Sequence, residues 1–210
     1  MNRIVLTVFV VEAILGAVGL AGAWWFETPI LEDMRVDLRS GAIAIVATIP
    51  LLVVSLSGLR SKSGFGAELL EVIRKTLGKL FASCSVIDLL IVSIMAGIGE
   101  ELFFRGFLQA SLGNVIHPWL ALVLVSILFG VVHWASWVYA LAAGLIGLFL
   151  GVVFLVTGNL FVAIAVHALY DFFAMLVIVR MLRPLANAKE DGTISGTIST
   201  DQEHNKESIQ

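Results

Sequence analysis

The sequence is poor in cysteine, in basic clusters and in familiar metal-binding patterns. One of its 210 residues is a cysteine, Cys84, so an internal disulfide framework and a cysteine-rich metal site are excluded. Its lysines and arginines form no cluster of the kind that binds nucleic acid, so we expect no nucleic-acid partner. The HExxH pattern of the common zinc proteases does not occur.

What the sequence has in excess is apolar side chains. Hydrophobic residues make up 59% of the chain, whereas a soluble domain has about 45–50%. A spanning helix needs about 20 mainly apolar residues, and long continuous runs favour helices over the alternating strands of a barrel. We therefore expect an all-α, polytopic transmembrane helix bundle, integral to a bacterial or archaeal cell membrane. About six spans are expected, at 4–26, 40–59, 86–110, 118–137, 138–157 and 160–181.

The first apolar run has features of both a signal peptide and a spanning helix. It follows Arg3, and Ala21-Gly22-Ala23 fits a small-x-small cleavage pattern. We favour a retained helix, because the run is long enough to span and ends in Trp24-Trp25-Phe26, an interfacial aromatic belt. Glu12 interrupts this run, and we expect it to be paired or to reach the membrane surface.

The loop charges predict the orientation of the bundle. The 27–39 loop carries four acidic residues and two arginines, whereas the 60–85 segment carries five basic residues. Basic loops stay on the cytoplasmic side, so we expect both termini in the cytoplasm. Within 65–82, charged residues recur at three- and four-residue steps between leucines. This pattern predicts an amphipathic helix on the membrane surface, with a solvated linker helix as the alternative.

The chain divides into three parts on this basis. Residues 1–85 form an N-terminal transmembrane hairpin with the amphipathic helix, and residues 86–185 form a membrane core that carries the candidate site. Residues 186–210 are polar and rich in serine, threonine and acidic residues. Such a segment cannot bury a core, so we expect a disordered tail.

Ionisable residues lie in the third expected span, where lipid makes them costly. Arg105 follows Glu101 by four residues, so the two side chains share a helix face and are expected to form an ion pair. Two neighbouring carboxylates cannot easily both be ionised in a low-dielectric medium, so Glu100 remains as the unpaired candidate for a general base. A structural ion-pair cluster that locks two helices is the alternative.

The fourth and sixth expected spans add two histidines. His133 follows Phe129 by four residues, and counting from the turn before 118 places its depth within about 4–5 Å of that of Glu100. His167 and Asp171 are also four apart, so the aspartate can orient the imidazole or stabilise its charged form. The same counting places His167 nearer the outer membrane face than His133. The alternatives are that this helix is steeply tilted, that the turn before it dips into the membrane, or that the expected boundaries are displaced. Alternatively, both histidines are satisfied core residues without a catalytic role.

These elements together resemble the CPBP family, which includes type II CAAX prenyl endopeptidases and bacteriocin-processing and immunity proteins. The family pattern is EExxxR, then FxxxH, then HxxxN or HxxxD, on successive transmembrane helices. It stands here as Glu100-Glu101 with Arg105, Phe129 with His133, and His167 with Asp171. The resemblance covers about residues 85–180.

The resemblance implies a role for each of these positions. Glu100 would be the proteolytic glutamate and His133 the histidine that activates water. His167 and Asp171 would fall where the family holds the oxyanion. The prenyl proteases typically have asparagine where Asp171 stands, and a carboxylate cannot donate a hydrogen bond, so we expect Asp171 to orient or charge His167. Structural support of the site is expected from Glu101, Arg105 and Phe129.

Three hypotheses for function follow. The favoured one is an intramembrane endopeptidase that requires no cofactor and acts on a peptide or membrane-protein substrate, possibly prenylated, within the lipid bilayer. The second is a zinc-dependent version, with Glu100, His133 and His167 as ligands. The third is a non-enzymatic membrane protein, either an immunity protein or a proton-coupled transporter, although the sequence shows no evident inverted repeat.

Overall fold

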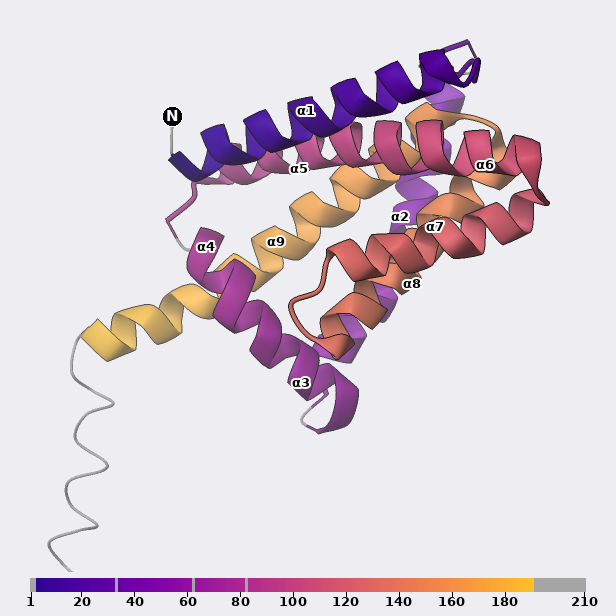
Figure 1. Cartoon of the computed structure of the whole chain (residues 1–210). Helices are drawn as coiled ribbons and strands as arrows, with labels where there is room; N and C mark the ends of the chain where they lie inside the picture. The colour runs from indigo at the N-terminus through magenta and orange to yellow at the C-terminus, as the bar shows by residue number, and fades with distance from the viewer. Residues whose placement is uncertain (1–2, 33, 62, 82, 191–210) are drawn as a thin grey trace, which may run out of the picture.

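Every regular element in the described part of the chain is a helix. The computed structural model describes residues 3–32, 34–61, 63–81 and 83–190, and the arrangement of its elements is shown in Figure 1. The elements are α1 (Arg3–Trp25), α2 (Leu38–Leu59), α3 (Gly64–Ile73), the π-helix η1 (Arg74–Gly78), α4 (Lys79–Phe81), α5 (Val86–Glu101), the π-helix η2 (Leu102–Gln109), α6 (Ala110–Val115), α7 (Pro118–Val132), α8 (Trp137–Thr157) and α9 (Leu160–Glu190).

The predicted class, an all-helical membrane bundle, is confirmed. Four segments are long and apolar enough to cross a membrane, namely α1, α2, α8 and residues 160–181 of α9. The other two expected spans are helical but differ in form. The α7 helix is a shorter apolar helix of 15 residues. Residues 86–115 are helical throughout but are divided into α5, η2 and α6.

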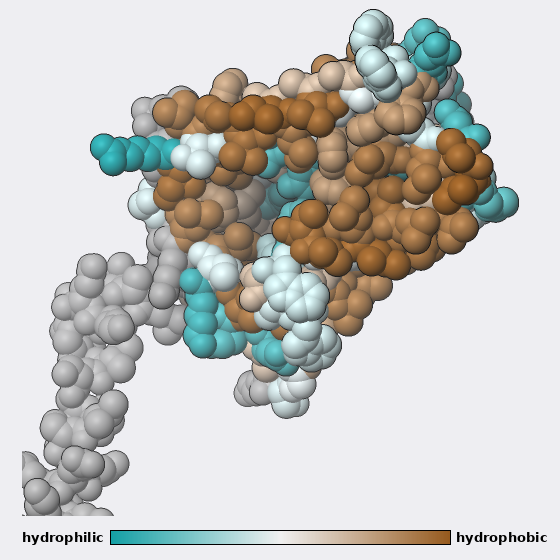
Figure 2. Space-filling model, viewed as in Figure 1, coloured by the Kyte–Doolittle hydropathy of each residue, from teal (hydrophilic) through white to brown (hydrophobic). Residues whose placement is uncertain are grey.

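The outer surface of the bundle is suited to lipid. Large apolar side chains are exposed along α1, α2 and α7, including Ile14, Val54 and Ile127, which are 58–72% exposed. Figure 2 shows broad hydrophobic surfaces over α1 and α7, with hydrophilic residues gathered at the ends of the bundle and in a recess between the helices. Since exposed apolar side chains of this extent are costly in water, the chain is an integral membrane protein.

Local capping sets where the helices around the site begin and end. The hydroxyl of Ser85 accepts a hydrogen bond from the Asp88 amide and Asp88 accepts one from the Ser85 amide, a capping box that begins α5. Ser136 caps α8 by accepting from the Tyr139 amide. The expected 118–137 span therefore ends early, at Val132, because the chain must turn before Ser136. This leaves His133 in the turn at the end of α7.

The α1 and α5–η2 segments lie side by side (Figure 1) and approach closely at glycines. A Cβ atom added to Gly19 would lie 2.8 Å from the Leu102 carbonyl carbon and the Phe103 amide nitrogen. Small residues allow backbones in lipid to come this close, and the gain is van der Waals contact. The first apolar run therefore packs as an integral helix of the bundle.

Gly19→Ala is expected to destabilise the protein by about 1–3 kcal/mol, because the new methyl group meets backbone that cannot rotate away. Gly41→Ala in α2 is the matched control, since nothing lies within 4 Å of its added Cβ atom. Thermal unfolding of both variants in the same detergent measures the difference. Equal melting temperatures would contradict the close packing of α1 on η2.

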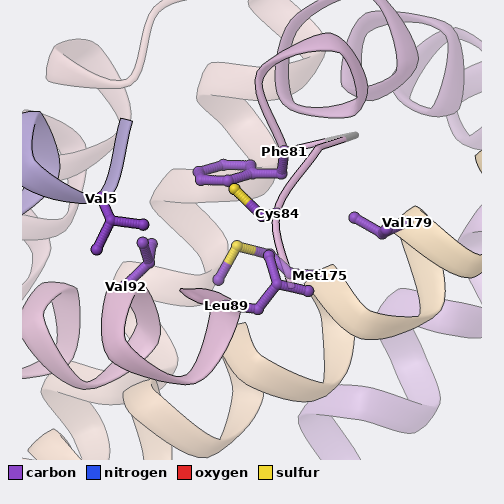
Figure 3. Packing of buried hydrophobic residues seen from close by; sticks show 7 residues of the cluster. All are labelled: Val5, Phe81, Cys84, Leu89, Val92, Met175 and Val179. Atoms are coloured by element: carbon purple, nitrogen blue, oxygen red, sulfur yellow. The ribbon is translucent and has the colours of Figure 1, made fainter. Parts of the chain in front are cut away.

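The predicted amphipathic segment is helical and is built from α3, η1 and α4. Its apolar side packs against the bundle: Ile73 is buried with Leu59 and Ile178. At its end, Phe81 joins a second buried cluster with residues of α1, α5 and α9, shown in Figure 3. The members of that cluster are Val5, Phe81, Cys84, Leu89, Val92, Met175 and Val179. This segment therefore ties α1, α5 and α9 together at one end of the bundle.

The last helix runs beyond the expected membrane core. The α9 helix continues to Glu190, so the first residues of the expected 186–210 tail belong to a helix. Residues 191–210 lie outside the described part of the chain. Figure 1 shows α9 crossing the other helices obliquely, and this crossing brings its middle to the candidate site.

Candidate active site

A buried ionic network links four elements of the bundle, namely α5, η2, α8 and α9. One oxygen of Glu101, Oε1, lies 2.7 Å from Arg105 Nη1 and 2.8 Å from His167 Nδ1. Arg105 also donates a hydrogen bond of 2.7 Å to the Gly147 carbonyl of α8. Both Glu101 and Arg105 are fully buried. Because burial of a charge is costly unless it is paired, this network fixes the relative positions of η2, α8 and α9.

The predicted Glu101–Arg105 ion pair is thus present, and its second partner, His167, was missed. Counting residues placed His167 nearer the outer face than His133 and left a steeply tilted helix as one explanation. The α9 helix is oblique (Figure 1), and its His167 meets Glu101. The close contact of Gly97 with α9 marks the same crossing, since a Cβ atom there would lie 2.9 Å from the Ile164 carbonyl oxygen.

Phe129, on α7, lies between the ionic network and His133. Its ring stacks on His133 with centroids 4.5 Å apart and an interplanar angle of 27°. The Arg105 guanidinium lies 4.7 Å from the centroid of the same ring, a cation–π contact. Phe129 is itself buried, so the spacing of Phe129 and His133 sets the position of the imidazole as well as its depth.

Glu100 and His133 face one another from α5 and the end of α7. His133 Nε2 lies 3.7 Å from Glu100 Oε2, which is longer than a direct hydrogen bond. His133 Nδ1 lies 2.8 Å from the Phe129 carbonyl oxygen, and because a carbonyl only accepts, Nδ1 carries hydrogen. A neutral His133 therefore presents the lone pair of Nε2 towards Glu100. Two facing acceptors need a proton or a water molecule between them.

This pair is more accessible than the ionic network beneath it. The side chains of His133 and Glu100 are 28% and 13% exposed, compared with 1% or less for Glu101 and Arg105. Glu100 Oε2 has no hydrogen-bond partner among the described residues. Figure 2 shows hydrophilic residues within a recess of the apolar surface. A partly exposed imidazole that faces a buried, unpaired carboxylate oxygen over a dry ionic network is suited to general acid–base chemistry.

His167 lies between two carboxylates. Its Nδ1 meets Glu101 and its Nε2 lies 3.5 Å from Asp171 Oδ2. Asp171 is at the edge of the site, with its side chain 29% exposed. The longer Nε2 contact is the weaker one, so Nε2 is more available than Nδ1 to contact a bound molecule.

Glu12 also reaches the site, which the sequence analysis did not predict. Its Oε2 is buried, has no hydrogen-bond partner among the described residues, and lies 2.7 Å from where a Cβ atom of Gly99 would be. The signal that could have revealed it is the acid itself, placed within an apolar run. His117, in contrast, only caps α7, by accepting a hydrogen bond from the Trp119 amide.

The arrangement of these side chains does not form a metal cluster. Within the described residues, no group of three or more His, Cys, Asp or Glu side chains is placed to hold a metal ion. Of the three residues considered as zinc ligands, His167 directs Nδ1 to Glu101, and Glu100 and His133 face each other. The donor set therefore fits a metal poorly, and we derive no chemistry through one.

The chain resembles a known protein family over a segment that contains the site residues from Glu100 to Asp171. A family model described as type II CAAX prenyl endopeptidase Rce1-like matches residues 82–173. A protein of Bacillus subtilis (strain 168), described as uncharacterized protein YpbD, is 26% identical over 164 residues, which are 75% of this chain and 80% of that protein. No solved structure matches the chain.

The matched segment runs from the start of α5 to the middle of α9 and includes the three helices whose side chains meet at the site. It contains both facing pairs, Glu100 with His133 and Glu101 with Arg105, and also His167 and Asp171. Through residues 82–173, the chain is therefore similar to the Rce1-like family of type II CAAX prenyl endopeptidases.

Proposed function

We propose that this protein is an intramembrane endopeptidase in which Glu100 and His133 activate a water molecule for peptide hydrolysis. The family supports a CAAX-protease-like activity in general terms. The observation that carries the mechanism is the gap of 3.7 Å between His133 Nε2 and Glu100 Oε2. The gap is too long for a direct hydrogen bond, and both groups are more exposed than the Glu101–Arg105 pair.

The first step is proton removal from water. Glu100 takes a proton from a water molecule that also contacts His133 Nε2, and the hydroxide attacks the carbonyl carbon of the peptide. The Nδ1 hydrogen bond to the Phe129 carbonyl and the stack on the Phe129 ring hold the imidazole in one orientation. The proton then passes to the leaving amine from Glu100 or His133. Each group ends the cycle in its initial protonation state.

The second step is stabilisation of the oxyanion. His167 is the candidate, because its Nε2 is held less tightly than its Nδ1 and faces the accessible side of the site. Asp171 positions this nitrogen and favours the charged ring, which stabilises a developing negative charge. Glu101, Arg105 and Phe129 support the site by fixing His167 and His133.

The test is cleavage of a panel of quenched peptides, prenylated and unprenylated, by the purified protein in lipid nanodiscs. We expect at least one peptide to be cut by the wild type. A well-folded protein that cuts none of the panel would favour the non-enzymatic alternatives, an immunity protein or a proton-coupled transporter. Comparison of prenylated with unprenylated peptides identifies the substrate class.

We also propose that hydrolysis requires no metal. The reason is the poor fit of the described side chains to a metal cluster. Protein that has been washed with a chelator is expected to keep its peptidase activity, with elemental analysis showing no stoichiometric zinc. Loss of activity on chelation and its recovery on addition of zinc would support the zinc-dependent alternative.

A further inference from the structure

Glu12 is an acid of the site that comes from outside the family-matched segment. It lies on α1, whereas the family match begins at residue 82. Its Oε2 is buried against Gly99, where a Cβ atom would lie 2.7 Å from Oε2 and 2.5 Å from the Glu12 carbonyl oxygen. Gly99 directly precedes Glu100. The missing side chain at Gly99 therefore leaves room for the Glu12 carboxyl group beside the proposed general base.

The surroundings of Glu12 contain all four ionisable groups proposed for catalysis. Glu12 interacts electrostatically with Glu100 on α5, with His133 at the end of α7, and with His167 and Asp171 on α9. The two carboxylates among them oppose a negative charge on Glu12, and the two imidazoles are already directed at other acids.

Glu12 differs from the other acids in having no partner of its own. In the described part of the chain it forms no ion pair, and its Oε2 forms no hydrogen bond. Glu101 has Arg105, and Glu100 has His133. A buried carboxyl group without a cation is more stable in its neutral form, because desolvation and neighbouring carboxylates both oppose ionisation. A neutral carboxylic acid, unlike a carboxylate, can donate a hydrogen bond.

We propose that Glu12 is a positioning residue that stays protonated. Its O–H group donates a hydrogen bond towards Glu100, directly or through one water molecule. This rests on the proposed function. The hydrogen bond holds Glu100 ionised and oriented towards His133, so that the base is ready before substrate binds. Glu12 and Glu100 would thus have different roles, a neutral hydrogen-bond donor and an ionised base, because their environments differ.

Two variants separate this role from simple packing. Glu12→Gln keeps a donor in a side chain of the same shape, and we expect a peptidase rate only a few-fold below the wild type. Glu12→Leu fills the space without a donor, and we expect the rate to fall by about 10- to 100-fold, the range of one hydrogen bond to a charged group. Equal rates for the two variants, whether high or low, would overturn the proposal.

The pH profile gives a readout that packing alone would not change. If Glu12 acts in its protonated form, the wild-type rate falls at alkaline pH as Glu12 loses its proton. Glutamine cannot lose a proton in this range, so this alkaline limb is expected to be missing in Glu12→Gln. An alkaline limb that is the same in both proteins would contradict the proposal.

Infrared spectroscopy tests the proton without any substrate. Near neutral pH, the wild type is expected to show the C=O stretch of a protonated carboxylic acid, and Glu12→Gln is expected to lose it. Glu71→Gln is the control, since that side chain is 55% exposed and paired with Lys75. A wild-type spectrum without the band, or a band that survives in Glu12→Gln, would overturn the proposal. A protein that has the band but cuts no peptide would contradict the proposed function instead.

Discussion

Arg105→Met is expected to lower the free energy of unfolding by about 3–5 kcal/mol, the usual cost of removing one partner from a buried ion pair. Arg105 and Glu101 have side chains that are 1% and 0% exposed, with 2.7 Å between Nη1 and Oε1. Without the guanidinium, Glu101 keeps only His167 as a partner and the Gly147 carbonyl loses its donor. Chemical denaturation in mixed micelles measures the difference from the wild type.

The double variant Glu101→Gln/Arg105→Met separates the charge effect from lost packing. When both charges are removed, no charge is left buried without its partner, so part of the lost stability is expected to return. The double variant should therefore be more stable than Arg105→Met alone. If Arg105→Met unfolds at the same denaturant concentration as the wild type, the network does not hold the bundle together.

Glu100→Gln is expected to lower the rate of peptide cleavage by about 10²–10⁴-fold, the usual contribution of a general base. Glutamine has nearly the same shape as glutamate but cannot take a proton from water. Stability is expected to change little, because Glu100 belongs neither to the Glu101–Arg105 pair nor to the hydrogen bond of Arg105 to α8. The rate is measured with any peptide that the wild type cuts.

Glu71→Gln serves as the control for the loss of a glutamate elsewhere in the chain. Glu71 is exposed on α3, pairs with Lys75 at 3.1 Å and is not one of the side chains of the site. Surface pairs of this kind contribute little to stability. Its variant is expected to cut at the wild-type rate. A well-folded Glu100→Gln protein with wild-type activity would remove Glu100 from the mechanism.

The sequence was sufficient for contacts that depend on local helical geometry. The four-residue spacing of Glu101 and Arg105 predicted their ion pair, which the structure contains at 2.7 Å. The same spacing places Phe129 under His133. These contacts are predictable because the rise and turn of a helix fix which side chains meet, whatever the rest of the fold does.

Contacts that depend on how helices cross could not be predicted in this way. Counting from the turns gave similar depths for Glu100 and His133, which do face each other, but left the tilt of the helix that carries His167 open. Residue counting assumes upright helices, whereas the oblique path of α9 brings His167 to Glu101. Tilt depends on packing with neighbouring helices, which a single sequence does not show.

Glu12 illustrates a second limit. An acid in an apolar run usually reaches the surface or finds a partner, and the sequence gives no sign of which side chains surround it. The close approach that brings it to the site depends on Gly99, whose small size is visible in the sequence but whose neighbour is not. Likewise, α7 ends early because the chain turns before the Ser136 cap of α8. From the sequence alone, the same residues are expected to belong to one continuous span.

A double-mutant cycle on the cleavage rate tests most directly whether Glu100 and His133 act on one water molecule. The rates of Glu100→Gln, of His133→Asn and of the double variant are compared with that of the wild type. Groups that act as a unit are strongly non-additive, so the double variant is expected to be about as slow as Glu100→Gln alone. A double variant whose loss equals the product of the two single losses would show that the two residues act independently, and would contradict the account.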